Sequence, residues 1–296
     1  MSSDRHLDEA VAARVLAQQF PELAGAAVTP LGAGWDHDVF LCEGLVFRFP
    51  KRIDQVAWLA RETEVLRLAR AVLGSIVPDF SYVGEPTSDF PYPFVGYPLV
   101  PGIPADAHLP DHGALAADLG AALTRLHNVD AGLVPPTPTG EEPLAAAGHR
   151  LDLSSCARAV RERLPTALRA AADPYLLGEL PLPPLVGGRV FAHNDICAEH
   201  VLVDAASGRL TGLIDWTDAM VTDPAVDFVG LITISDWSFV RSVREAYRRP
   251  LDQTFAQRLT WLTRTMTLRW LGEAIEEGMD DSRHFAWVQR AFADKP

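Results

Sequence analysis

Cysteine is scarce in this sequence of 296 residues, which has three, Cys42, Cys156 and Cys197. The number is odd, the positions are scattered, and no two of them form a CxxC pair. This pattern excludes a disulfide framework and a zinc knuckle as the basis of the fold. Cys197 lies near His193 in the sequence, but nothing orients such a pair, so we do not expect a thiol nucleophile.

Basic residues are also few. There are 26 Lys and Arg against 39 Asp and Glu, which gives a net charge of −13. This balance argues against nucleic acid or an anionic membrane as the main partner, because both attract positively charged surfaces. A cationic small molecule is compatible with it.

Long apolar runs are missing as well. No stretch approaches the roughly 20 apolar residues that a membrane-spanning helix needs. The first ten residues, MSSDRHLDEA, contain no apolar signal-peptide core. We therefore expect a cytoplasmic protein without a membrane partner.

The chain is long enough for two lobes with sizeable cores, and its patterns change along its length. The first part predicts a helix over 7–19, a β-hairpin with its turn at Glu43-Gly44, and a helix over 54–73. A Pro- and Gly-rich joint follows near 96–104. From about residue 113 the chain is mainly helical, with one β insert at 191–217, and we find no internal repeats.

The insert carries the most chemistry. The stretch FAHNDICAEHVLVD places Asp195 at the end of one predicted strand and His200 at the start of the next, and LIDW places Asp215 after a third. Side chains at strand ends can converge on one site. Two carboxylates and an imidazole suit a divalent cation and a proton acceptor. The step of five residues from Asp195 to His200, with an acid on the next hairpin, matches kinase-type phosphoryl transfer.

The upstream half of a kinase pattern is present too. A turn in LGAGWDHDVF contains Gly32 and Gly34, Arg48 lies on a following strand, and Glu62 lies in the next helix. In kinases such groups cover the phosphates, contact them and hold that contact, respectively. The turn lacks the full GxGxxG pattern, and Arg48 stands where most kinases have Lys. Arg keeps the charge and can bind phosphate bidentately.

Four segments together resemble bacterial antibiotic phosphotransferases of the kinase-like fold. They are GWDHDVFLCEGLVFRFPKR, YPFVGYPLVPGIP, HNDICAEHVLVD and GLIDWTDAMVTDPAVDF. The chain is most similar to the aminoglycoside 2''-phosphotransferases, with the macrolide 2'-phosphotransferases close behind. The HND triplet and His at position 200 are typical of these two subfamilies.

The resemblance implies a two-lobed α+β, kinase-like fold. It predicts a β-rich nucleotide-binding lobe over 1–97, a hinge over 98–104 and a helical lobe over 105–296. It implies that Asp195 is the catalytic Asp, which orients the substrate hydroxyl and accepts its proton, that His200 and Asp215 hold Mg²⁺, and that Asp227 braces the catalytic loop. By the same resemblance, the backbone around Pro98 and Val100 reads the purine edge of GTP or ATP. His193 is read as a packed, structural histidine.

The resemblance also implies a substrate-binding surface in the helical lobe. The candidate residues are Asp236, Trp237, Glu273, Glu276 and Glu277. The acids from Glu273 onward, with Asp280 and Asp281, recur at about one helical turn and are expected to share a face. Glu199 is read as a solvated loop charge.

The expected activity is transfer of the γ-phosphoryl group of GTP or ATP to a hydroxyl of an aminoglycoside, by a Mg²⁺-dependent monomer. Two alternatives stay open. A macrolide kinase would need an apolar, aromatic site with few acids, and the C-terminal region is rich in both Trp and acids. A nucleotide-binding pseudokinase without turnover is the other, and the presence of Asp195 and Asp215 argues against it.

Overall fold

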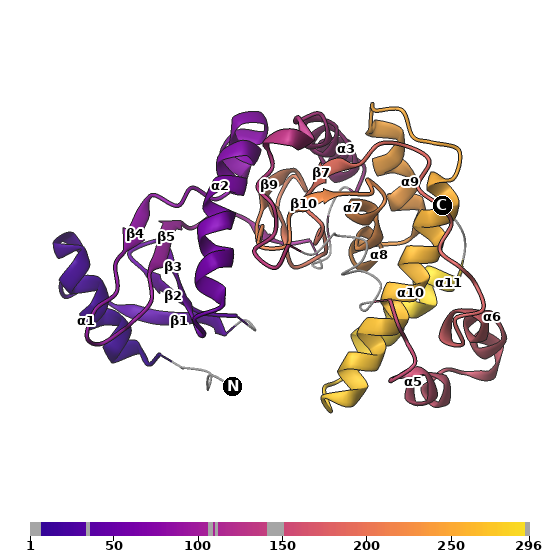
Figure 1. The fold of residues 1–296 in the computed structure, drawn as a ribbon, viewed down its shortest axis with the longest axis horizontal. Helices are drawn as coiled ribbons and strands as arrows, with labels where there is room; N and C mark the ends of the chain where they lie inside the picture. Colours follow the sequence, from indigo (N-terminus) through magenta and orange to yellow (C-terminus); the bar gives the residue numbers. More distant parts are fainter. Residues whose placement is uncertain (1–6, 34–35, 106–108, 110–111, 141–150, 294–296) are drawn as a thin grey trace. The chain divides into compact units, whose positions relative to one another are not determined.

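The computed structural model describes residues 7–33, 36–105, 109, 112–140 and 151–293 (Figure 1). The chain divides into two compact units. The first comprises Met1–Pro101 with Pro135–Thr139, and the second Gly102–Val134 with Gly140–Pro296. Within the described part of the chain, no helix combines the length and the apolar character needed to cross a membrane.

The first unit is built on an antiparallel sheet with the strand order β1-β2-β3-β5-β4. Its turn between β2 and β3 has positive φ at both Glu43 (49°) and Gly44 (75°), as a two-residue type I′ hairpin requires. The predicted hairpin with its turn at Glu43-Gly44 is confirmed. The strands are β1 (Val28–Ala33), β2 (His37–Cys42), β3 (Leu45–Pro50), β4 (Tyr82–Gly84) and β5 (Phe94–Pro98).

Aromatic side chains fill the core of this unit. Phe49 stacks on Phe94 with ring centroids 4.4 Å apart, and both are fully buried. The ring of Phe47 lies against Gly96 in β5, where an added Cβ would come within 2.3 Å of it. A strand glycine is needed at that position because it lets the ring approach the backbone. Two helices, α1 (Glu9–Gln19) and α2 (Gln55–Leu73), complete the unit and confirm the two helices predicted there.

The second unit is mainly helical, as predicted for the chain beyond residue 113. The long helix α10 packs against α5, α6 and α11 around a buried cluster that includes Leu268, Leu271 and Val288. Two short helices, α5 and α6, lie between α3 and the β insert. The helices are α3 (His112–His127), α5 (Ala157–Arg163), α6 (Thr166–Leu176), α7 (Val226–Val229), α8 (Leu231–Ile234), α9 (Trp237–Ala246), α10 (Phe255–Glu276) and α11 (Ser282–Ala293).

Two small antiparallel sheets in this unit contain the strands of the predicted β insert over 191–217, together with β6 and β10, which lie outside those bounds. One pairs β7 with β10, and the other has the order β6-β8-β9. The loop 193–200 joins β7 to β8, and the loop 214–219 joins β9 to β10. β7 is paired with β10, and β8 is paired with β9. The first loop therefore starts beside the strand where the second loop ends, and it ends beside the strand where the second loop starts. The strands are β6 (Ile103–Pro104), β7 (Val190–Ala192), β8 (Val201–Val203), β9 (Leu210–Leu213) and β10 (Met220–Thr222).

A buried ion triad anchors the end of β10. Arg258 of α10 is 1% exposed and donates from Nε to Asp223 (2.5 Å) and from Nη1 to Asp252 (2.7 Å). Its two acidic partners satisfy the guanidinium, which would otherwise be a costly buried charge. The hydrogen bonds from Arg258 hold the pKa of Asp252 well below its ordinary value. The triad ties the strand next to β7 to the longest helix of the unit.

Candidate active site

The loops that follow β7 and β9 hold their side chains in an unusual backbone conformation. Asn194 has φ 67° and Asp215 has φ 62°, the left-handed region that residues other than glycine seldom adopt. Such strained positions persist where surrounding contacts impose them, and they cluster at functional sites. The Asn194 amide group donates to the Asp218 carbonyl (3.2 Å), which joins the two loops directly.

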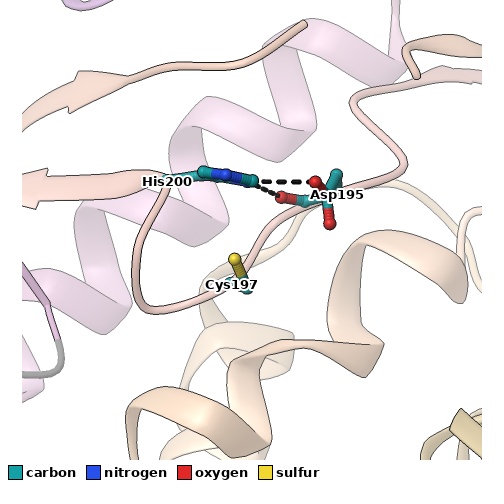
Figure 2. Close-up of side chains that lie close together, drawn as sticks. All are labelled: Asp195, Cys197 and His200. Carbon is teal, nitrogen blue, oxygen red and sulfur yellow. Dashed lines mark hydrogen bonds and ion pairs between the residues drawn. The ribbon is translucent and has the colours of Figure 1, made fainter. Parts of the chain in front are cut away.

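Asp195, His200 and Asp215 come together as the sequence predicted. The His200 Nδ1–H donates to the Asp195 carbonyl (2.9 Å) and lies 3.1 Å from the Asp195 carboxylate. Its other ring nitrogen, Nε2, lies 3.8 Å from the Asp215 carboxylate. Figure 2 shows the imidazole directed at Asp195 across the loop. Burial lowers the pKa of His200, but hydrogen bonds with Asp195 and Cys197 outweigh it and raise the pKa above its ordinary value.

His193 lies fully buried between the two loops. Its Nε2–H donates to the Ile214 carbonyl (3.1 Å), and its Nδ1 accepts the Asp195 N–H (3.3 Å). The ring packs on Trp216 with centroids 4.4 Å apart. Burial lowers the pKa of His193, so the neutral tautomer that these two bonds require is the stable form. His193 thus links the backbone beside Asp195 to the backbone beside Asp215.

The carboxylate of Asp227 lies directly beneath the 193–200 loop. It is fully buried and accepts the backbone N–H groups of His193 (3.0 Å) and Asn194 (2.6 Å). His127 of α3 supplies a third contact through Nε2 (2.9 Å), and its Nδ1 meets the Tyr247 hydroxyl at 2.8 Å. A buried hydrogen-bonded chain therefore runs from Tyr247 to the loop that carries Asp195.

Asp215 and His200 offer a donor set that fits a divalent cation. Because the His200 Nδ1–H is used by a backbone carbonyl, Nε2 is the ring nitrogen that faces Asp215, and it would bind a cation by giving up its proton. Metal-binding histidines commonly have their second nitrogen fixed in this way. The Asp215 carboxylate supplies the oxygen that Mg²⁺ prefers, and its side chain is 45% exposed.

In the first unit, Arg48 and Glu62 form a buried ion pair. Arg48 Nη1 lies 2.7 Å from Glu62 Oε1, and their side chains are 10% and 2% exposed. Gly32 lies in β1, at an irregularity in the pairing with β2. Gly34 lies outside the described residues.

The segment predicted to read the purine follows β5. Pro98 is the exposed last residue of that strand, and Val100 is buried. Between them, the Leu99 N–H donates to the Gly44 carbonyl (2.9 Å), which fixes the segment against the β2–β3 turn.

Two of the predicted substrate residues have other uses. Trp237 is 2% exposed and its Nε1–H donates to the Ala291 carbonyl (3.2 Å). Its ring therefore belongs to the core, and the prediction that it faces substrate is wrong. The Asp236 carboxylate caps α9 by accepting the N–H groups of Ser238 (2.9 Å) and Phe239 (3.2 Å).

The acids at the end of α10 do not form one helical face. The helix ends at Glu276, because Gly278 adopts φ 68° just beyond it, and Asp280 and Asp281 lie in the loop that follows. Asp281 is paired with Arg163 at 2.6 Å. The predicted shared face is therefore wrong beyond the last turn of the helix.

The three acids predicted as substrate ligands differ in their surroundings. Glu273 is paired with Arg269 at 2.7 Å, whereas Glu276 and Glu277 are exposed. Arg283, at the start of α11, forms an ion pair with Glu199 of the loop that carries Asp195. Glu199 is therefore half-exposed and paired, not merely a solvated loop charge.

Sequence reasoning missed the contributions of Asn194, His127 and Tyr247. His127 and Tyr247 lie 100 and 20 residues from Asp227, so no local spacing connects them to the loop. The asparagine in the HND triplet could have indicated a backbone position with positive φ, because Asn tolerates positive φ better than most residues.

Comparisons with known proteins agree with this fold. A model of the phosphotransferase enzyme family, APH, matches residues 27–265. The GDP and kanamycin complex of APH(2'')-IIIa has 24% identity and a TM-score of 0.72, over 95% of this chain and 96% of that one. Macrolide 2'-phosphotransferase MphH from Brachybacterium faecium has 23% identity and a TM-score of 0.64, over 96% and 99%. The predicted kinase-like fold and the predicted resemblance are confirmed.

A curated relative, the uncharacterized protein YcbJ of Bacillus subtilis, is 29% identical over 204 residues. The match takes in 64% of this chain and spans 62% of the relative's own length.

Proposed function

The chain belongs to the phosphotransferase enzyme family, and on that premise we propose that it transfers the γ-phosphoryl group of GTP or ATP to a hydroxyl group of an aminoglycoside. The observation that carries the proposal is the convergence of Asp195, His200 and Asp215 on two adjoining loops. A structural loop would have no need to hold two half-exposed carboxylates around one imidazole. The kanamycin complex of a relative supports the substrate class.

In this proposal Asp195 orients the substrate hydroxyl and accepts its proton. Its carboxylate is 39% exposed, so a hydroxyl can reach it. The backbone around it is fixed from both sides, by Asp227 at residues 193 and 194 and by His193 at residue 195. Positioning of this kind supplies much of the rate in phosphoryl transfer, where the protein does little covalent chemistry.

Asp215 and His200 would hold Mg²⁺, which neutralises charge that develops on the transferred phosphoryl group. In the first unit, Arg48 would contact the nucleotide phosphates and Glu62 would keep its guanidinium in place. Gly32 would lie over the phosphates. Pro98 has no N–H, so only its carbonyl can meet the purine edge, whereas Val100 can also donate.

We propose that the acidic segment at the end of α10 binds the ammonium groups. Glu276 and Glu277 are exposed at a helix C-terminus, where negative charge is unfavourable to the helix itself. Six residues beyond Glu277, Arg283 pairs with Glu199 on the Asp195 loop, and this contact supports a substrate site that extends from the loop toward the segment. Glu273 and Asp236 would extend the same acidic surface.

A macrolide remains the second candidate for a specific reason. The half-buried rings of Trp270 and Trp287 meet at 6.0 Å, and His284 packs on Trp287 at 4.8 Å. These rings lie on the facing parts of α10 and α11 and offer an aromatic surface to an apolar ring. A binding protein without turnover is disfavoured because both carboxylates are in place.

Replacing Asp215 tests the metal assignment. In Asp215→Asn, Mg²⁺ should no longer tighten the binding of non-hydrolysable GTP or ATP analogues, with a loss of at least about tenfold. Calorimetric titration with and without Mg²⁺ measures this effect. Asp204→Asn, which alters an exposed acid in the β8–β9 turn, is the control and should behave as wild type. An unchanged Mg²⁺ effect in Asp215→Asn would assign the metal to another acid.

The substrate class can be tested through salt and charge. Kanamycin-type ligands should lose affinity steeply as salt rises and in a Glu276→Gln/Glu277→Gln double variant, because screened or missing carboxylates no longer attract ammonium groups. An erythromycin-type ligand, with a single amine, should respond weakly to both changes. Glu179→Gln/Glu245→Gln removes the same charge from exposed positions elsewhere in the unit and is the control. Tight, salt-insensitive macrolide binding without aminoglycoside binding would favour the second candidate.

A further inference from the structure

One group in the catalytic loop has no part in the proposed mechanism. Cys197 lies two residues after Asp195 and three before His200, and the residue is partly exposed. The structure brings one ligand atom of each of these three residues to within 4.8 Å of the others. Figure 2 shows the Cys197 sulfur on the same loop, below the Asp195–His200 pair.

The loop presents these donors in a fixed arrangement. Ile196 and Ala198, on either side of Cys197, are buried at 2% and 1% exposure. The Ala198 N–H donates to Thr233 Oγ1 (2.8 Å), and Gly230 packs so closely that an added Cβ would lie 2.0 Å from the Ile196 carbonyl oxygen. Asp195, Cys197 and His200 are therefore held on a fixed backbone and remain partly exposed.

The donor types select a particular class of metal. Thiolate, imidazole and carboxylate together are a zinc-type set, whereas Mg²⁺ avoids sulfur. Around a tetrahedral Zn²⁺ such donors are about 3.3–3.7 Å apart, from bond lengths of about 2.0–2.3 Å. The His200 Nδ1–Asp195 distance is already 3.1 Å. Side-chain adjustments of about 1 Å would bring the sulfur into range.

We propose that Asp195, Cys197 and His200 form a binding site for Zn²⁺ or a similar thiophilic divalent cation, with water as the fourth ligand. On binding, the Cys197 thiol and the His200 Nδ1–H each release a proton to solvent, so that the thiolate forms the metal–sulfur bond and Nδ1 forms the metal–nitrogen bond in place of its hydrogen bond to the Asp195 carbonyl. This site shares His200 with the proposed Mg²⁺ site, which pairs that residue with Asp215 and uses no sulfur. Since the bound ion would engage the Asp195 carboxylate, it would inhibit phosphoryl transfer, a consequence that rests on the proposed function.

The binding itself is tested without turnover. Co²⁺ is titrated into the metal-free full chain, because a Co²⁺–thiolate bond gives an intense charge-transfer band in the near ultraviolet. We expect this band to saturate at about one ion per chain, to disappear when Zn²⁺ is added, and to persist in excess Mg²⁺. His200→Gln should weaken Co²⁺ binding at least about tenfold.

Cysteine variants locate the site. Cys197→Ser should abolish the band, whereas Cys42→Ser and Cys156→Ser, which alter buried thiols, should retain it. In the unaltered chain, Zn²⁺ should also protect Cys197 from alkylation by iodoacetamide, read by peptide mass spectrometry, so the test does not depend on any variant folding. No band in the wild type, a band that survives Cys197→Ser, or unprotected alkylation would each overturn the proposal.

Discussion

Asp195→Asn should lower turnover at least about a hundredfold while leaving nucleotide affinity nearly unchanged. The amide has almost the same shape as the carboxylate, but it cannot accept the proton of the substrate hydroxyl, and losses of this size are typical when a general base is removed. Arg48, Glu62 and the segment after β5, which would bind the nucleotide, lie in the other unit of the chain.

This prediction requires two measurements on the same preparations. Steady-state release of GDP or ADP gives turnover, and calorimetry gives nucleotide affinity. Asp204→Asn has the same chemical change at an exposed position and should keep wild-type turnover. Full activity in a folded Asp195→Asn variant would remove this residue from the reaction.

Asp227→Ala should destabilise the second unit by about 3–5 kcal/mol, the range found when one partner of a buried charged contact is removed. The substitution leaves the N–H groups of His193 and Asn194 and the imidazole of His127 without their acceptor, in a fully buried place. Denaturant unfolding followed by circular dichroism measures the loss.

Two variants sharpen this second test. Asp227→Asn keeps one acceptor oxygen, so it should lose less stability than Asp227→Ala. Its turnover should still fall, because the loop that carries Asp195 would be displaced. Glu245→Gln changes an exposed acid of α9 and should stay within about 0.5 kcal/mol of wild type. If the midpoint denaturant concentration of Asp227→Ala equals that of the wild type, Asp227 does not brace the loop.

The parts of the account that the sequence predicted depend on short-range rules. The Glu43-Gly44 turn follows from two adjacent residues that tolerate positive φ. The strand ends that carry Asp195, His200 and Asp215 adjoin one another. Their spacing along the chain is therefore enough to predict that the three side chains lie close together.

The parts that it missed depend on distant contacts. Trp237 is buried because α11 brings the Ala291 carbonyl to its indole, 54 residues further along the chain. The contact between His127 and Asp227 spans 100 residues, and no periodicity encodes it. The end of α10 is a different case, because Gly278 was a readable C-terminal signal that helical spacing of the acids obscured.

The measurement that tests the central claim most directly is mass spectrometry of the acceptor after incubation with Mg²⁺ and GTP or ATP. Kanamycin-type and erythromycin-type compounds are incubated separately with the wild-type chain and with Asp195→Asn. We predict that the wild type adds one phosphoryl group to the aminoglycoside and that Asp195→Asn adds at least about a hundredfold less in the same time. If neither class of compound gains a phosphoryl group, or if both proteins phosphorylate it equally, the proposed function of this site is wrong.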